Sequence, residues 1–215
     1  MENEKTLKGF VTQENESFIN FANITKHARE TLKGNWVKAV LVALIYLLIT
    51  AGISVVFGKI NVVVGNIAAL IIAGPLVLGL TVFVLSISRK QDSEVVQLFD
   101  GFKRFFVALG TYLLMLLFIL LWGLLLIIPG IVKGLAYSMT FFILADDRNI
   151  NPLAAITKSK EMMKGHKFEF FCLGLRFVGW GLLALLTAGI GFLWLVPYIN
   201  VSYAKFYDDL KAAQK

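Results

Sequence analysis

Long runs of apolar residues alternate with short charged segments along this chain of 215 residues. Four stretches contain no charged residue at all, and they lie between Lys38 and Lys59, Lys59 and Arg89, Arg104 and Lys133, and Arg176 and Lys205. A helix that crosses the hydrocarbon core of a bilayer needs about 20 mostly apolar residues. The pattern is therefore typical of a protein that crosses a membrane several times.

The pattern predicts an all-α integral membrane protein with about six transmembrane helices, arranged as three helical hairpins. The predicted spans are Trp36–Phe57, Val62–Ser88, Phe105–Ile128, Ile131–Ala145, Phe168–Leu186 and Phe192–Phe206. Pro129-Gly130 is expected to end the third span and to reverse the chain. The fourth span is short and has Lys133 near its start, so the sequence does not decide whether this helix crosses the whole bilayer. A single membrane domain, residues 24–210, lies between polar tails at 1–23 and 211–215.

The charged segments before each hairpin have the apolar spacing of helices. They are Asn23–Asn35, Ser93–Arg104 and Asn151–Lys167. In the second segment an α-helix would bring several apolar side chains to one face, namely Val95, Val96, Leu98, Phe99 and Phe102. We predict amphipathic helices that lie in the membrane interface. The alternative is that these helices pack on other helices of the protein.

The three connecting segments also end alike, which indicates an internal repeat. Gly34, Gly101 and Gly165 follow similar residues at intervals of 67 and 64 positions. The second arm of each predicted hairpin carries one proline, at Pro75, Pro129 and Pro197. The repeat predicts an interfacial helix, a glycine corner and a hairpin, used three times. The shared chemistry of helix ends is the alternative explanation.

Composition and charge agree with a membrane protein and set its orientation. The chain is 58% hydrophobic and 16% charged, whereas a soluble domain has about 25% charged residues. Of the 21 Lys and Arg residues, only Lys59 and Lys133 fall in the predicted outer loops. Because basic residues stay on the inner side, both termini are predicted to be cytoplasmic, in a multi-pass protein of the cytoplasmic membrane.

The net charge of +7 bears on the partners. The basic residues flank apolar runs and do not form the continuous patch that a nucleic-acid groove requires, so we expect no nucleic-acid partner. Their positions suit the lipid bilayer itself, with anionic lipids at the inner leaflet. A membrane protein partner is also possible, and the sequence does not identify it.

No catalytic constellation is recognisable in the sequence. The two histidines, His27 and His166, are far apart and lack the spacing of a zinc site. No nucleophile elbow and no phosphate-binding glycine loop occur. We therefore expect no enzyme activity, no metal and no cofactor.

Polar residues in apolar surroundings are the candidate functional residues, because they are costly in a membrane. Arg176 and Glu169 are seven residues apart and share a helix face, so they can line a polar cavity or contact a lipid headgroup. Arg176 reaching to the inner interface is the simpler interpretation. If a continuous polar cavity exists, we expect it around Arg176 and Tyr198.

Further candidates lie at the predicted membrane boundaries. Lys133 and Tyr137, one turn apart, mark either an outer vestibule or an interfacial anchor. Asp146-Asp147 and Asp208-Asp209 end two second arms, and either bind a cation or are solvated carboxylates beside basic neighbours.

Several ordered motifs resemble a known family. They include Trp122-Gly-Leu-Leu-Leu-Ile-Ile-Pro-Gly130, Met163-Lys-Gly-His166, Thr187-Ala-Gly-Ile-Gly191 and Trp194-Leu-Val-Pro-Tyr198. The chain thus resembles the DUF975 family, multi-pass membrane proteins mainly of Gram-positive bacteria to which no activity is assigned. The family is distantly similar to the membrane region of some glycerophosphodiester phosphodiesterases, an analogy that transfers no chemistry. The resemblance implies a non-enzymatic accessory or scaffold protein at the inner leaflet. A transporter, channel or lipid-translocating protein is the alternative.

Overall fold

The computed structural model describes residues 20–59 and 61–214, and these residues form helices without strands. In chain order the helices are α2 (Phe21–Leu32), α3 (Trp36–Gly58), α4 (Val62–Ser88), η1 (Val95–Arg104), α5 (Phe105–Leu125), α6 (Ile127–Tyr137), α7 (Thr140–Asp146), α8 (Pro152–Met162), α9 (Lys167–Leu186) and α10 (Phe192–Ala213). Most of the polar N-terminal tail predicted at 1–23 lies outside the described residues. The predicted all-helical class is confirmed.

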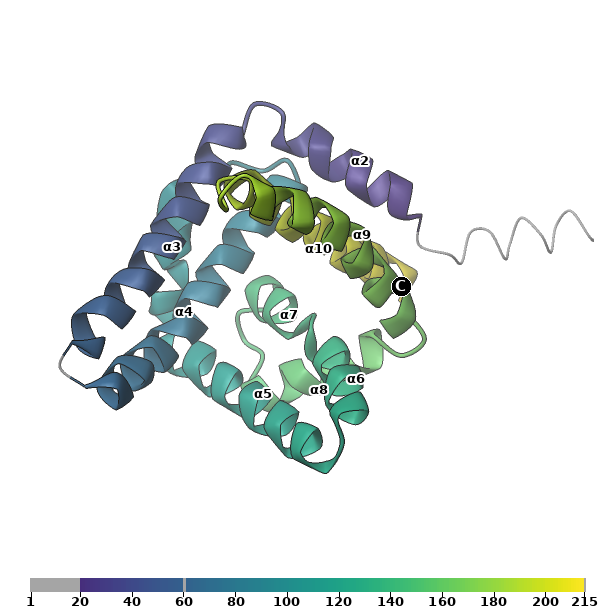
Figure 1. The fold of residues 1–215 in the computed structure, drawn as a ribbon. Coiled ribbons are helices and arrows are strands. Elements are labelled where there is room, and N and C mark those ends of the chain that lie inside the picture. Colours follow the sequence, from purple (N-terminus) through teal and green to yellow (C-terminus); the bar gives the residue numbers. More distant parts are fainter. Residues whose placement is uncertain (1–19, 60, 215) are drawn as a thin grey trace, which may run out of the picture.

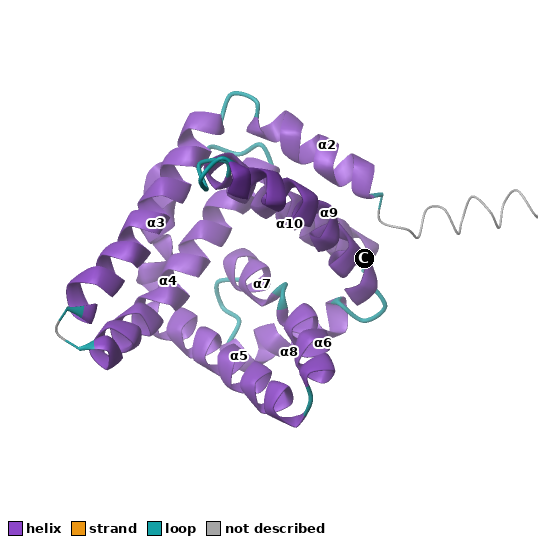
Figure 2. Cartoon of the chain, in the orientation of Figure 1, coloured by secondary structure: helices purple, strands orange, loops and turns teal. Residues whose placement is uncertain are grey.

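Three helical pairs form the frame of the molecule. α3 pairs with α4, α5 with α6 and its continuation α7, and α9 with α10. In Figure 1 these pairs lie along three sides of a triangle, with α7 near its middle. A shorter helix precedes each pair, and short loops join the successive helices (Figure 2). This order of elements is the one that the sequence repeat predicts.

Five segments are long and apolar enough to cross a membrane, within the part of the chain that the structure describes. They are Trp36–Gly58, Val62–Ser88, Val95–Leu124, Ile128–Asp146 and Lys167–Leu186. α10 does not qualify, because Lys205, Asp208 and Asp209 lie in its second half. The five segments indicate a membrane-embedded protein, while the predicted sixth span, Phe192–Phe206, is not confirmed.

The tip of the third pair lies beside the beginning of α3. Thr187 and Gly191, at the turn between α9 and α10, line one cavity together with Trp36, the first residue of α3. The six-span prediction separates this turn from Trp36 by the hydrocarbon core, about 30 Å. Figure 1 instead shows the tip of the third pair beside α3 and α4, with α9 and α10 extending away from them. The six-span arrangement is therefore not confirmed at this hairpin.

The second pair turns at Leu126 and not at Pro129-Gly130 as predicted. Leu126 has an extended backbone between α5 and α6. Pro129 is the third residue of α6, where it is tolerated because amide groups in the first turn have no partner within the helix. Gly130 approaches α5 closely, since an added Cβ would lie 2.9 Å from the Gly123 Cα. The predicted third span, Phe105–Ile128, is thus three residues too long.

The predicted fourth span, Ile131–Ala145, is divided between α6 and α7. A buried serine of α8 bridges the break between them. The Ser159 hydroxyl donates a hydrogen bond to the Ala136 carbonyl oxygen at 2.9 Å and accepts one from the Met139 amide at 3.2 Å. The sequence offers no proline or glycine at this break, so a prediction from helix-breaking residues misses it.

Replacing Ser159 by alanine is expected to destabilise the protein by about 1–3 kcal/mol, because the buried Met139 amide loses its partner. The measurement is the midpoint of thermal unfolding of the purified protein in detergent. Ser138→Ala is the control, since within the described residues that hydroxyl bonds only to the Leu135 carbonyl of its own turn. Equal midpoints for the two variants would show that Ser159 does not hold the junction.

Two of the connecting helices pack their apolar faces on the hairpins. α2 buries Ile24, Ala28 and Leu32, and α8 buries Ala155, Ile156 and Met162. The charged residues of both helices face outward. For α2 and α8 the structure thus favours the alternative of packing on other helices over apolar faces immersed in lipid.

The middle connector, η1, is a 3₁₀ helix, and its apolar residues form two faces where one was expected. A 3₁₀ helix has three residues per turn, so every third side chain shares a face. Leu98 and Gly101 are buried, whereas Val96, Phe99 and Phe102 are exposed. η1 therefore packs on the hairpins with one face and presents an apolar stripe outward with another, as an interfacial helix does.

The predicted glycine corners are of two kinds. Gly34 and Gly165 have φ angles of +88° and +89° and follow α2 and α8, the conformation that commonly ends helices. Gly101 lies within η1 and serves close packing instead. A Cβ at Gly101 would overlap the Pro75 carbonyl oxygen of α4. The three units of the repeat therefore differ at this position.

The second half of α4 is the centre of the core. It is buried because η1, α5, α7 and α10 all pack against it. Gly74 lets the backbone of α5 approach, since an added Cβ would lie 2.6 Å from the Ala108 carbonyl oxygen. At Gly79 a Cβ would overlap the Leu98 carbonyl oxygen of η1. These contacts hold the first hairpin against the second, and they position the charged end of α4.

Candidate functional site

Five polar side chains meet where α4, α7 and α10 end, and we call them the polar hub: Arg89, Asp146, Tyr207, Asp208 and Lys211. Arg89 lies at its centre, with Nη1 2.7 Å from Asp146 Oδ1 and Nη2 2.7 Å from Asp208 Oδ1. The Tyr207 hydroxyl donates a hydrogen bond to Asp146 Oδ2 at 3.0 Å, and the Lys211 ammonium also contacts this oxygen. Each of the three helical pairs thus contributes at least one charge to a single network.

The hub is electrically balanced. Two cations, Arg89 and Lys211, face two carboxylates, Asp146 and Asp208. Burial acts against the charged form of Arg89, but its hydrogen bonds to the two aspartates outweigh burial and raise the pKa of the guanidinium. Burial and the adjacent Asp146 carboxylate likewise raise the pKa of the Tyr207 hydroxyl. The hub therefore stays ion-paired, and Tyr207 stays protonated, at neutral pH.

Two side chains from the connectors, His27 and Arg104, cover two helix ends beside the hub. His27 Nε2 lies 2.9 Å from the Ser88 carbonyl oxygen at the end of α4, so this nitrogen carries the proton. The Arg104 guanidinium donates to the Leu144 carbonyl oxygen at 2.8 Å and to the Ile150 carbonyl oxygen at 3.4 Å. At Ser88 and Leu144 these donors satisfy carbonyl groups at the ends of α4 and α7, and the Arg104 charge suits the negative end of the α7 dipole.

The two candidate residues of α9, Glu169 and Arg176, have different surroundings. Glu169 Oε2 lies 2.8 Å from His166 Nδ1, one turn earlier in the chain. Arg176 is exposed and makes no ion pair or hydrogen bond with any residue that the structure describes. The structure thus brings Glu169 to His166 and leaves Arg176 on the outer face of the helix.

Lys133 and Tyr137 lie one turn apart on α6, as predicted. Their surroundings differ. The Lys133 ammonium lies 4.3 Å from the ring centroid of Trp122, a cation–π arrangement. Tyr137 is buried, and its ring lies beside Phe118 and near Ile156 of α8. The geometry of Lys133 agrees with an interfacial anchor, and Tyr137 belongs to the packing between α5, α6 and α8.

Tyr198 ties the third hairpin to the first connector. Its hydroxyl donates a hydrogen bond to the Thr25 carbonyl oxygen of α2 at 3.2 Å. Its ring meets Phe177 edge to face, with centroids 5.5 Å apart. Tyr198 also lines a cavity, and that cavity is mostly apolar.

Two apolar cavities lie along the third hairpin. The tryptophan cavity, about 350 Å³, is bounded by Arg29, Trp36, Trp180, Trp194 and Tyr198 together with residues of the α9–α10 turn. The second, about 580 Å³, lies between α3, α4 and α10 and has Tyr46 and Asn200 among its mostly aliphatic walls. Tyr198, one of the two residues around which a polar cavity was to be sought, thus lines a mostly apolar cavity.

The sequence profile of one family, described as "Protein of unknown function (DUF975)", matches residues 20–134 and 123–214. The chain belongs to this family. The resemblance that the sequence motifs indicate is confirmed by these matches, which together cover all of the described residues. No curated protein and no solved structure matches the chain.

The polar hub of this DUF975 protein was only partly foreseeable. The sequence shows paired aspartates at the ends of two second arms, whereas Arg89 stands in it only as the charged residue that ends an apolar run. The informative feature is that all three second arms end in or near a charge, at Arg89, Asp146 and Asp208. In a threefold repeat these positions converge, so opposite signs there predict ion pairs. Both Asp146 and Asp208 bind Arg89, which leaves a bound cation no role at these carboxylates.

Proposed function

We propose that this DUF975 protein is a non-enzymatic accessory or scaffold protein of the bacterial cytoplasmic membrane, acting at the inner leaflet with both termini in the cytoplasm. The observation that carries the proposal is the polar hub. Charges at the centre of the molecule neutralise one another and join the three helical pairs, as expected of groups that fix an architecture.

The exposed stripe of η1 supports a role at the membrane surface. Val96, Phe99 and Phe102 face outward beside Lys103, whose side chain is also exposed. An apolar stripe next to basic residues suits the boundary between headgroups and acyl chains of an anionic leaflet. We expect a membrane protein partner to bind this chain at the same stripe.

Transport is the alternative, and the prolines in the second arms were its basis. Broken helices build transport sites when their free backbone groups line a polar cavity. Pro75 is instead buried against Gly101, and Pro197 lies on the wall of the apolar 580 Å³ cavity. These positions favour packing roles for the prolines and weaken the transport alternative.

The proposal is tested first by flux. Purified protein reconstituted in liposomes should leave the exchange of ions, peptides and labelled lipids at the rate of protein-free liposomes. If the protein accelerates the exchange of ions, peptides or lipids, and Arg176→Ala reduces that acceleration, the scaffold proposal is overturned in favour of transport.

The second experiment is photo-crosslinking in the native bacterium. A photoreactive residue at Val96, on the exposed stripe, should capture the same membrane protein in repeated experiments. The same residue at Leu120, an exposed position of α5, is the control and should capture lipid only. Capture of nothing but lipid or this chain itself at Val96 would contradict a scaffold that organises a partner.

A further inference from the structure

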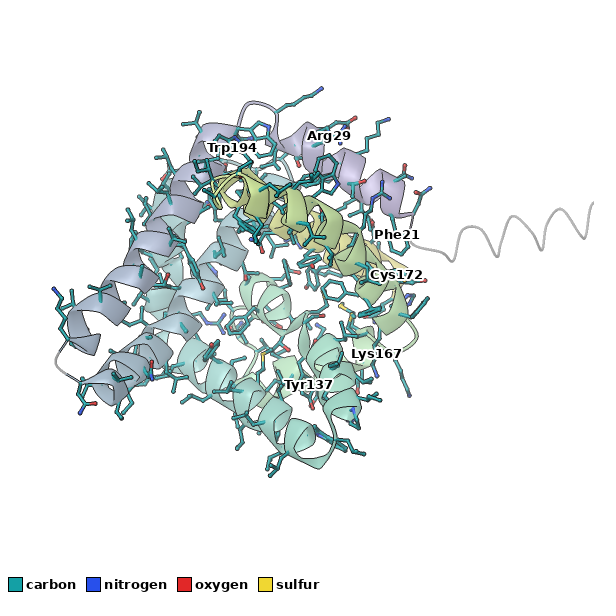
Figure 3. The ribbon with its side chains drawn as sticks, in the orientation of Figure 1. Phe21, Arg29, Tyr137, Lys167, Cys172 and Trp194 are labelled. Atoms are coloured by element: carbon teal, nitrogen blue, oxygen red, sulfur yellow. The ribbon has the colours of Figure 1, made fainter. Side chains whose placement is uncertain are left out.

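The tryptophan cavity has an unusual combination of walls and rim. Its walls are indole rings and aliphatic side chains from α3, α9 and α10, and Arg29 of α2 is the charged residue on its boundary. Figure 3 places Arg29 and Trp194 at the same end of the molecule, over the tip of the third hairpin. The volume, about 350 Å³, falls in the range of small-ligand sites.

The polar groups of this cavity fall into two classes. The Tyr198 hydroxyl donates to the Thr25 carbonyl oxygen, and the Thr187 hydroxyl donates to the Ala184 carbonyl oxygen and accepts from the Gly191 amide. These hydroxyls are satisfied within the protein. The Arg29 guanidinium and the three indole N–H groups make no hydrogen bond or ion pair with any described residue. The cavity therefore offers a ligand donors and a positive charge.

A boundary made of donors and one cation selects a ligand rich in acceptors and negative in charge. The apolar walls select a hydrocarbon portion next to that group, because water in such a cavity finds few partners. A guanidinium binds a phosphate oxygen pair with two parallel hydrogen bonds. Indole rings are enriched at the level of lipid headgroups, where their N–H groups meet polar atoms and their rings meet acyl chains.

We propose that the tryptophan cavity binds one anionic phospholipid, with the phosphate diester on Arg29 and the upper part of an acyl chain among Trp36, Trp180 and Trp194. This site goes beyond the scaffold role and does not depend on it. The 580 Å³ cavity is a weaker site for a defined lipid, because no charged residue lies on its boundary. A free phosphate is a poor occupant, since it leaves the apolar walls uncovered.

Native mass spectrometry of the purified protein tests the site. The protein in detergent is mixed with dioleoylphosphatidylglycerol or with dioleoylphosphatidylcholine, which has the same chains and no net charge. We expect one phosphatidylglycerol to be retained roughly tenfold more tightly than phosphatidylcholine, because phosphatidylcholine has the same phosphate diester but adds a quaternary ammonium, whose positive charge opposes the Arg29 guanidinium. Equal retention of the two lipids would overturn the assignment of an anionic ligand.

Substitutions then locate the site. Arg29→Gln should remove the preference for phosphatidylglycerol, and Arg29→Lys should keep most of it. The control is Arg148→Gln, the same substitution at an exposed arginine outside this cavity. An unchanged preference in Arg29→Gln, or an equal loss in Arg148→Gln, would show that the lipid binds elsewhere or by net charge alone.

The apolar walls and the source of the phosphate are tested in the same way. Trp194→Ala should weaken retention of phosphatidylglycerol, whereas Trp122→Ala, at a tryptophan outside the cavity, should not. Glycerol 1-phosphate, a phosphate monoester of glycerol without an acyl chain, should fail to displace the lipid at millimolar concentration. Displacement by glycerol 1-phosphate, or no effect of Trp194→Ala, would contradict a site that holds an acyl chain.

Discussion

Replacing Gly79 by alanine is expected to destabilise the protein by about 2–4 kcal/mol, because the new methyl group has no space. An added Cβ would overlap the Leu98 carbonyl oxygen, a backbone atom that no rotamer change can remove. Relief requires η1 to move away from α4, and that movement also separates Gly101 from the Pro75 carbonyl group. The expected result is a lower midpoint of thermal unfolding in detergent, together with loss of ordered packing at η1.

Gly181→Ala is the matched control for this substitution. Gly181 lies within α9, and no atom lies within 4 Å of its added Cβ. Alanine has a higher helix propensity than glycine, by about 1 kcal/mol, so this variant should be unchanged or slightly more stable. If Gly79→Ala also keeps the wild-type midpoint, the close contact between α4 and η1 does not determine stability.

The sequence predicts those elements whose cause is local. Val62–Ser88 is predicted with its observed bounds, because its apolar run is bounded by charged residues at both ends. Gly34 and Gly165 are correctly predicted as corners, since a positive φ angle favours glycine whatever surrounds it. Five apolar segments suited to a membrane follow from composition and length in the same way.

The features that the sequence misses depend on contacts between distant segments. The break between α6 and α7 is bridged by Ser159, twenty residues later in the chain. η1 is a 3₁₀ helix whose buried face fits the glycines of α4, and its apolar residues alone suit an α-helix equally well. The position of the α9–α10 turn beside Trp36 depends on how the third pair crosses the first.

The candidate functional residues also divide into those that spacing along one helix predicts and those whose partners depend on the fold. Arg176 and Glu169 were paired because seven residues place them on one helix face, but His166 lies nearer to Glu169 and binds it. Arg29 was not singled out, because its significance comes from indoles contributed by three other helices. Spacing within one helix is readable from sequence, whereas partners across helices require the fold.

Arg89→Met is expected to be the most disruptive substitution in the polar hub. Arg89 is the cation that lies between Asp146 and Asp208, and its removal leaves two carboxylates facing each other with only Lys211 nearby. Breaking a fully buried ion pair costs about 3–5 kcal/mol. The side chains of Arg89, Asp146 and Asp208 are 13% to 27% exposed, so solvent screening lowers the expected loss to about 2–3 kcal/mol.

A second substitution separates the loss of charge balance from the loss of packing. In the double variant Arg89→Met with Asp208→Asn the surplus carboxylate is removed, so part of the lost stability should return. Lys103→Met is the control, since Lys103 pairs with Asp100 at the surface with its side chain 79% exposed, and it should change stability by less than about 0.5 kcal/mol. No recovery in the double variant would mean that Arg89 acts through packing alone. Recovery would establish that opposite charges at the ends of three repeated arms hold the helical pairs together.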